Sequence, residues 1–234
     1  MLITSLDNPK IKELSKLLTA KYRKKEKKFI VEGAHLVDEA RKCGVLLEAY
    51  SLEEKEGYIQ VTSQIMNKLS STDTTVSEIG LCKIIQKSEL SDKILILDAV
   101  QDPGNMGTLM RTAKAFGFDT IVLGTGCVDI YNNKVIRSSQ GAIFKLNFIN
   151  EDLISFIPKL EGYTIFGTNV ENGVELDSQE VTAKLAVILG NEGNGVSKEV
   201  QALASKNIYI PMNNTESLNV SIAGAIIMYK FRNN

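Results

Sequence analysis

The sequence predicts a two-domain α/β protein whose larger second domain has a parallel sheet covered by helices. Two observations carry this prediction. The chain has 234 residues, which is long for one small domain and suits two of modest size. In its second half, short apolar strands such as Ile94 to Leu97 and Leu185 to Leu189 alternate with helical patterns. That alternation is typical of a parallel sheet with helices on both faces.

The bulk composition indicates a globular protein with a sizeable core. Hydrophobic residues make up 44% of the chain and charged residues 24%, with a net charge of −1. The apolar runs are far too short to span a membrane, and the N-terminus lacks the apolar core of a signal peptide. We therefore expect a cytoplasmic protein without a membrane segment. The three cysteines are widely spaced and the chain has one histidine, so we expect no disulfide and no metal site.

The first domain, predicted over 1–88, begins with a basic helical segment. Asp7-Asn8-Pro9 is a good helix start, and Ile11 and Leu14 then recur at helical spacing. Between positions 10 and 28 there are nine Lys or Arg residues and only two Glu residues. Two interpretations stay open: a solvated helix face, or a phosphate-binding patch that contacts nucleic acid. Under the second interpretation the binding residues are Lys24, Lys25, Lys27 and Lys28.

The remaining elements of both domains follow from periodicity and turn residues. In the first domain we expect strands at 29–32, 45–52, 58–61 and 82–86, and helices at 34–42 and 63–69. The polar stretch from Lys87 to Asp92 predicts the boundary, so that the second domain covers 93–234. There we expect strands at 94–97, 120–123, 145–149, 163–168, 185–189 and 208–210. The expected helices are at 106–116, 132–139, 153–160, 197–204 and 218–231.

Three loops of the second domain stand at the carboxyl ends of predicted strands, where ligands of such sheets bind. The first is Asp102-Pro103-Gly104-Asn105-Met106-Gly107, followed by Arg111. Asn105 can cap the next helix, and Gly107 permits close approach to its first turn. Arg111 projects from the same face one turn later and suits a phosphate or carboxylate. Alternatively, it is a surface arginine beside an ordinary capped helix.

The second loop, Gly190 to Gly195, holds three glycines in six residues. Its backbone can contact a ligand directly, but it matches neither of the common phosphate-binding glycine motifs. Glu192 in its middle would repel a phosphate. That carboxylate better suits a hydroxyl donor, a cation, or a structural bond to a nearby backbone N–H.

The third loop runs from Ile210 to Ser221, between a short apolar strand and the last helix. It brings Ser217, Asn219 and Ser221 to the start of that helix. The following residues, Ala223 to Met228, have almost no polar side chain, so we expect the helix to be buried on all sides. Polar groups at the start of a rigid buried element are well placed to form a site.

Taken in order, the three loops resemble the three motifs of the SpoU (TrmH) family of RNA 2′-O-ribose methyltransferases, in the SPOUT superfamily. The resembling segments are Asn105-x-Gly107-x-x-x-Arg111, Leu189-Gly190-x-Glu192-Gly193-x-Gly195-Val196-Ser197, and Ile210-Pro211-Met212 with Glu216-Ser217-Leu218-Asn219-Val220-Ser221. The set spans the second domain. The first domain is similar to the family's ribosomal-protein-like substrate-binding domain, although its motifs are less specific. Asn191 and Val196 depart from the family pattern, and neither removes a functional group.

The resemblance implies an α/β fold with a deep trefoil knot, a bound S-adenosylmethionine, an RNA substrate and a homodimer. It places Gly190, Ile210 and Leu218 at the cofactor. It assigns Arg111 to catalysis, where a permanently protonated guanidinium suits a clamp on the RNA phosphate beside the target ribose better than a base. The polar positions Asn105, Glu192, Ser217 and Asn219 would hold the hydroxyl and the arginine.

The substrate and the activity leave alternatives. Ribosomal RNA of the large subunit is the expected substrate, and transfer RNA is the alternative. A protein of the same fold that binds RNA and assists ribosome assembly without turnover is the rival from another class. A third interpretation is a nicotinamide-nucleotide site, for which Gly124-Thr125-Gly126 is the only supporting motif. The acidic residue that would bind the ribose is missing at the expected spacing.

Overall fold

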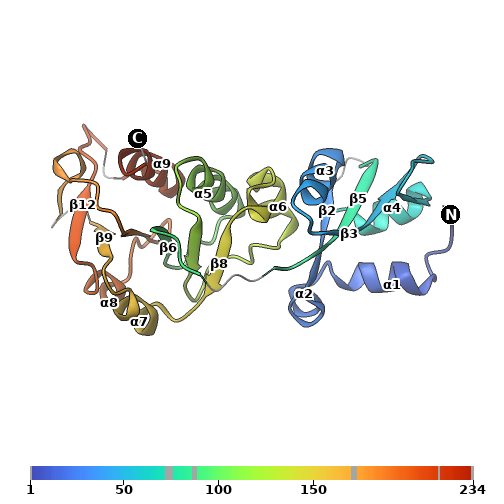
Figure 1. Ribbon diagram of the computed structural model, residues 1–234, viewed down its shortest axis with the longest axis horizontal. Coiled ribbons are helices and arrows are strands. Elements are labelled where there is room, and N and C mark those ends of the chain that lie inside the picture. Colours follow the sequence, from blue (N-terminus) through green and yellow to red (C-terminus); the bar gives the residue numbers. More distant parts are fainter. Residues whose placement is uncertain (1, 72–75, 86–88, 170–172, 216, 233–234) are drawn as a thin grey trace. The chain divides into compact units, whose positions relative to one another are not determined.

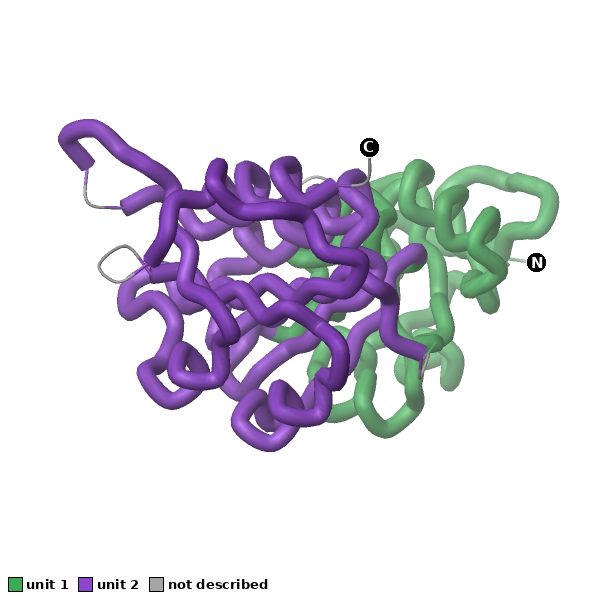
Figure 2. The backbone as a smooth tube through the Cα atoms, turned by 60° about the vertical axis from the view of Figure 1, so that its left-hand side comes forward, with its two compact units in different colours: residues 1–85, 129–144 green, residues 86–128, 145–234 purple. Residues whose placement is uncertain are grey.

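The computed structural model describes residues 2–71, 76–85, 89–169, 173–215 and 217–232 (Figure 1). The chain forms two compact units: 1–85 together with 129–144, and 86–128 together with 145–234 (Figure 2). The segment 129–144 thus comes from the second half of the sequence but packs in the first unit. The predicted boundary at 87–92 falls in part on 86–88, outside the described residues. The division into 1–88 and 93–234 stays a prediction.

The first unit is built on a mixed sheet whose five described strands lie in the order β1-β4-β3-β5-β2. β5 pairs antiparallel with β2 and with β3, whereas β4 pairs parallel with β1 and with β3. The strand predicted from position 82 begins earlier, because the apolar residues Ile79 and Leu81 already lie in the core. The strands are β1 Leu2–Ile3, β2 Lys28–Glu32, β3 Leu46–Ser51, β4 Ile59–Val61 and β5 Glu78–Lys83.

Helices cover both faces of this sheet. On one face, α1 (Pro9–Lys16) and α4 (Ser63–Leu69) pack their apolar residues against Tyr50 and Ile79, next to α2 (Ala20–Glu26). Asn8 caps α1, and its side chain accepts from the Lys10 N–H. On the other face lies α3 (Ala34–Lys42).

The segment 129–144 completes this second face with α6 (Asn133–Ser139) and the 3₁₀ turn Ala142–Phe144. The ring of Phe29 in β2 lies 4.7 Å from that of Tyr131 and 6.2 Å from that of Phe144. The buried Glu32 accepts a hydrogen bond of 2.7 Å from Asn133 Nδ2. The segment therefore contributes both apolar packing and polar partners to the first unit.

The second unit has seven described strands in the order β10-β12-β9-β11-β6-β7-β8, and every pairing is parallel. This confirms the predicted parallel sheet. The central strands β6 and β11 are buried along their whole length, as continuous apolar runs require. The strands are β6 Lys93–Leu97, β7 Thr120–Leu123, β8 Asn147–Asn150, β9 Thr164–Thr168, β10 Val174–Glu175, β11 Leu185–Leu189 and β12 Lys206–Tyr209.

Figure 1 shows α5 (Pro103–Ala115) and α9 (Val220–Lys230) on one face of this sheet, and α7 (Leu153–Phe156) and α8 (Lys198–Gln201) on the other. Two 3₁₀ turns, Ile157–Lys159 and Leu176–Ser178, complete the unit. Gly224 explains how α9 sits so close to its neighbours. A Cβ at this position would lie 2.6 Å from Leu109 of α5 and 2.7 Å from Leu189 of β11. None of the helices among the described residues is long and apolar enough to cross a membrane.

The expectation that the last helix is buried on all sides is wrong for the single chain. Ser221, Gly224, Ile227 and Met228 are buried, but the opposite face of α9 is open. That face carries Ile222, 51% exposed, Ile226, 39% exposed, and Tyr229, 54% exposed. The lack of a polar face on a helix therefore does not establish that its own chain covers every side of it.

Candidate functional site

The three predicted loops meet at the carboxyl edge of the parallel sheet. β6 and β11 are adjacent strands, so the loops that follow them start side by side. Ser197, at the end of the second loop, donates from its backbone N–H and its hydroxyl to Asp98 Oδ2, at 2.8 and 2.7 Å. β12 lies beyond β9 in the same sheet and delivers the third loop.

The first loop enters α5 through a cap that differs from the prediction. Asp102, not Asn105, is the N-cap residue, and its side chain accepts a hydrogen bond of 2.8 Å from the Asn105 N–H. Pro103 fills the first helical position, so the helix starts before the predicted residue, Met106. The Asn105 side chain is thereby free of the capping role and available to the other loops.

The second loop is folded back on itself around Gly190. A Cβ at Gly190 would lie 2.0 Å from the carbonyl carbon of Gly195, so only glycine fits there. Asn191 and Gly195 exchange two backbone hydrogen bonds of 2.9 Å. The Asn191 side chain accepts from the N–H groups of Gly193 and Asn194 and donates to the Ala99 carbonyl at 2.9 Å. Asn191, which the sequence marked only as a departure from the family pattern, therefore organises this loop.

Glu192 makes the structural bonds that were one of its three predicted roles. It accepts from the backbone N–H groups of Gln101 and Asp102, at 3.2 and 3.0 Å, and from Asn105 Nδ2 at 3.2 Å. Burial raises the pKa of Glu192, but these hydrogen bonds, that from Asp102 first, outweigh it and hold the pKa below its usual value. Glu192 thus stays ionised and ties the second loop to the first.

Asn219 joins the third loop to the same network. Its Nδ2 donates to Asn105 Oδ1 at 3.0 Å. As the N-cap residue of α9, its Oδ1 accepts from the backbone N–H of Ser221 at 2.9 Å and from the Ser221 hydroxyl at 2.6 Å. Glu192, Asn105 and Asn219 therefore form one chain of hydrogen bonds across all three loops.

A cavity of about 240 Å³ lies beside this chain of hydrogen bonds. Of the predicted cofactor residues, Gly190, Ile210 and Leu218 all line it. Of the predicted catalytic residues, Glu192 and Ser217 line it. The rest of the wall is mainly apolar and includes Leu189, Ile208, Met212, Val220, Ala223 and Ile227. Among the described residues, no lysine or arginine lines the cavity.

Three predicted site residues lie outside the cavity wall. Asn105 and Asn219 reach the site only through the hydrogen bonds given above. Arg111 is exposed on α5, and within the described part of the chain it makes no hydrogen bond or ion pair. Glu216, in the third motif, lies outside the described residues. The functional roles of all these residues stay predictions.

The predicted RNA-binding lysines lie in the first unit, at the end of α2 and the start of β2. Lys24, Lys25, Lys27 and Lys28 are all exposed. Arg23, from the same run, is a structural residue instead. It is buried, donates to the Leu17 carbonyl at 2.9 Å and pairs with Asp129 at 2.5 Å. No group of three or more His, Cys, Asp or Glu side chains suited to a metal ion occurs in the described ranges.

Comparison with known proteins matches both halves of the chain. The model of the SpoU rRNA Methylase family matches residues 92–229, and that of the MRM3-like substrate binding domain matches residues 8–80. The 23S rRNA (guanosine(2553)-2′-O)-methyltransferase RlmP of Bacillus subtilis is 37% identical over 98% of each chain.

Solved structures agree in fold. A putative RNA methyltransferase of the TrmH family from Porphyromonas gingivalis superimposes with a TM-score of 0.86, at 29% identity, over 97% of this chain and 98% of that one. An AdoMet-bound rRNA methyltransferase from Sinorhizobium meliloti gives a TM-score of 0.87 at 24% identity, over 98% of this chain and 96% of that one.

Proposed function

The chain belongs to the SpoU rRNA Methylase family, and we propose that it transfers a methyl group from S-adenosylmethionine to a ribose 2′-hydroxyl of RNA. The observation that carries the proposal is the arrangement of the three loops. Glu192, Asn105 and Asn219 link them into one network beside a mainly apolar cavity. A site held by such fixed hydrogen bonds can place a hydroxyl in line with a methyl donor, and positioning supplies a large part of a barrier reduction.

The residues of the cavity fit this cofactor. The wall combines the backbone of Gly190 with apolar side chains at Ile210 and Leu218, which suits an adenine ring. No described lysine or arginine lines the cavity, as expected for a ligand without phosphate groups. The carboxylate of Glu192 favours a cationic ligand. When bound, the cofactor supplies a methyl group on a positively charged sulfonium.

Arg111 is proposed to hold the RNA phosphate next to the reacting ribose. It is exposed and lies outside the cavity, so it can meet a large substrate from the solvent side. Ser217, on the wall, is proposed to contact the ribose, whereas Asn105 and Asn219 keep Glu192 and the α9 cap in place. The proposal also includes the trefoil knot of the family, which brings the third loop back to the second.

The proposed assembly is a homodimer that covers the open face of α9. Ile222, Ile226 and Tyr229 recur at helical spacing, and all three are exposed in the single chain. A contiguous apolar helix face is typical of a protein interface. A second copy would supply the same apolar face, as a two-fold interface requires.

The proposed substrate is large-subunit ribosomal RNA in the cytoplasm. The name of the Bacillus subtilis relative, with its coverage of the whole chain, supports this choice over transfer RNA. Mapping ribose methylation across total RNA from cells with and without the protein tests it. One position of large-subunit RNA should lose its methyl group, whereas loss at a transfer RNA position would favour the alternative.

Arg111→Ala separates the enzyme from a non-catalytic assembly factor. We expect methyl transfer to fall by about 10²-fold or more, because positioning is lost. Binding of S-adenosylmethionine, measured by calorimetry, should change little because Arg111 does not line the cavity. Absence of cofactor binding by the unaltered protein would refute the proposal. RNA binding without methyl transfer in the unaltered protein would favour the assembly factor.

A further inference from the structure

The first unit contains a second cavity, remote from the three loops in sequence and built by different elements. It encloses about 370 Å³, within the range of roughly 300–1,000 Å³ that is usual for small-ligand sites. Helices α1 and α2 form its walls, and strands β2, β3 and β5 contribute the remaining residues. The lining residues are Lys10, Glu13, Leu14, Lys16, Leu17, Tyr22, Lys25, Glu26, Lys28, Glu48, Tyr50 and Leu81.

The buried part of this cavity is apolar. Leu14, Leu17, Tyr50 and Leu81 are between 0% and 8% exposed, so they form the floor. The Tyr50 hydroxyl donates to the Glu48 carboxylate. Burial, and then the neighbouring Glu48, raises the pKa of Tyr50, which therefore stays neutral. A floor of this kind favours a flat, uncharged group.

The rim is charged and mixed. Four lysines and three glutamates give it a formal net charge of +1. Lys10 is held by Glu48 at 2.7 Å, and Lys25 lies 3.6 Å from Glu26. Lys16 and Lys28 make no ion pair within the described part of the chain, and Lys16 Nζ lies 5.7 Å from the centre of the Tyr22 ring. Two cations at the rim are thus open to a ligand.

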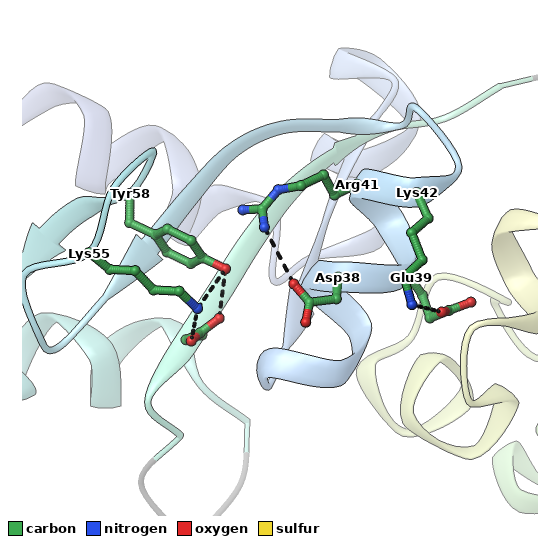
Figure 3. A network of polar contacts seen from close by, with 7 residues as sticks. Asp38, Glu39, Arg41, Lys42, Lys55 and Tyr58 are labelled. Atoms are coloured by element: carbon green, nitrogen blue, oxygen red, sulfur yellow. Dashed lines mark hydrogen bonds and ion pairs between the residues drawn. The ribbon is translucent and has the colours of Figure 1, made fainter.

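Three basic residues elsewhere in the first unit are engaged in ion pairs. Figure 3 shows Arg41 with Asp38, Lys42 with Glu39, and Lys55 with Tyr58 and a further carboxylate. That carboxylate belongs to Glu78, 2.7 Å from Lys55 Nζ. These pairs leave little charge for a ligand. Lys16 and Lys28 differ from these three residues because, within the described part of the chain, they make no ion pair and also line a cavity.

The ligand that satisfies both parts of the cavity is an unpaired nucleotide. The flat apolar face of a base can pack on the floor and on the Tyr22 ring. Its N–H groups can donate hydrogen bonds to carboxylates such as those of Glu13 and Glu26. Its flanking phosphates need cations at the rim of the cavity. Lys16 and Lys28 supply them there, and Lys25, 3.6 Å from Glu26, adds a third positive charge. A small polyanion would meet three carboxylates at the rim, and a duplex cannot insert a stacked base.

We propose that this cavity takes one unpaired base of the RNA substrate, with the adjoining phosphates on Lys16, Lys25 and Lys28. The inference rests on the proposed function for the identity of the substrate. Of the four predicted RNA-binding lysines, the proposal assigns phosphate contacts at this cavity to Lys25 and Lys28 alone, because Lys24 and Lys27 do not line it. The site would recognise a nucleotide other than the one that is methylated.

The test compares two double variants that remove the same charge. Lys16→Ala with Lys28→Ala alters the rim, whereas Lys21→Ala with Lys24→Ala removes two exposed lysines of α2 that do not line the cavity. Binding of a labelled single-stranded RNA octamer to the full chain is followed by fluorescence anisotropy. We expect the octamer affinity of the rim variant to fall by about tenfold and that of the control variant by about threefold or less. Equal losses would overturn the proposal.

A second pair of variants tests the aromatic wall. Tyr22→Ala should weaken octamer binding by about five- to tenfold, because stacking on a ring is lost, whereas Tyr22→Phe should keep the affinity. Unchanged binding by Tyr22→Ala would refute the site. If Tyr22→Ala fails to fold, ultraviolet cross-linking of a 4-thiouridine octamer to the unaltered protein decides instead. Cross-links at Tyr22 support the proposal, and their absence there contradicts it.

Further measurements distinguish RNA from a free nucleotide as the occupant. They also distinguish a failure of this site from a failure of the methyl-transfer site. A nucleoside monophosphate that binds the unaltered protein as tightly as the octamer would make the occupant a free nucleotide, against the proposal. Cofactor binding should be the same in all variants. If the unaltered protein shows no methyl transfer but the rim variant still binds the octamer more weakly than the control variant, the proposed function alone is refuted. Full methyl transfer with equal octamer binding by all variants refutes this inference alone.

Discussion

Asn105 Nδ2 and Glu192 Oε1 are joined by a hydrogen bond of 3.2 Å between residues that are 87 positions apart in the chain. The same Asn105 side chain accepts from Asn219 through its oxygen, at 3.0 Å. One amide therefore serves two loops at once, as donor to the second and acceptor from the third. A side chain that only donates or only accepts cannot keep both bonds at once.

Asn105→Ala should lower methyl transfer without abolishing cofactor binding. Both hydrogen bonds are lost, so Glu192 and the start of α9 are no longer fixed relative to each other. We expect a fall in kcat of about 10²-fold, as for a small misplacement of a reacting group. Calorimetry should show a cofactor Kd within about threefold, since Asn105 does not line the cavity. Asn194→Ala is the control, because among the described residues its side chain makes no hydrogen bond. An equal loss in both variants would contradict this role.

Glu192 should make stability depend on pH in the acid range. Its pKa in the folded protein is lowered, so its contribution is present above the unfolded value of about 4.3 and is lost as the pH falls through the folded value. Glu192→Gln removes this dependence. The difference in Tm between the two proteins, measured by scanning calorimetry, should therefore be largest near neutral pH and shrink below about pH 4.3. A difference that stays constant down to pH 3 would exclude the ionised carboxylate as its cause.

Gly190→Ala should damage the second loop far more than the neighbouring change Gly193→Ala. A Cβ at Gly190 meets backbone atoms of Gly195 at 2.0 Å, whereas a Cβ at Gly193 has ordinary contact at 3.6 Å with Asn191 Oδ1. We expect Gly190→Ala to weaken cofactor binding by at least about tenfold and to lower Tm, because the backbone must move. Gly193→Ala should bind the cofactor with a Kd within about twofold of that of the unaltered protein. Similar calorimetric titrations for the two variants would show that the loop adjusts.

Ile226→Lys should convert the proposed dimer to a monomer. A lysine in the centre of the α9 face would lose its hydration inside the interface, twice in a two-fold dimer. Sedimentation equilibrium should give the dimer mass for the unaltered protein and the monomer mass for the variant. Ile154→Lys on α7 is the control, because Ile154 is 45% exposed, close to the 39% of Ile226. A variant at Ile226 that still sediments as a dimer would place the interface elsewhere.

The sequence predicts the second unit well because its signals are local. Continuous apolar strands such as Ile94 to Leu97 and Leu185 to Leu189 allow few alternatives to a buried parallel strand. Parallel strands with loops at one edge then bring Gly190, Ile210 and Leu218 to the same cavity, as the structure shows. The positions of these residues follow from topology, while their chemistry came from the family resemblance.

Other features depend on contacts that no local pattern contains. The pairing of Arg23 with Asp129 joins residues from distant parts of the chain, so a basic run could not show that one member is structural. Asp and Asn can both cap a helix, so the residue type does not tell Asp102 from Asn105 as the cap. The cap is Asp102 because α5 begins at Pro103. The cavity near Tyr22 is formed by the packing of α1 and α2 on the sheet, which spacing along the sequence does not specify.

The segment 129–144 has a consequence for synthesis on the ribosome. The residues of 1–85 leave the ribosome first, but Phe29 and Arg23 then still lack Tyr131 and Asp129. The usual order, in which an N-terminal domain folds before the next is made, therefore cannot run to completion here. The native ring partners of Phe29 emerge only with the segment that contains α6, after β6 and β7 have already appeared. Chaperones that bind nascent chains have that interval in which to act.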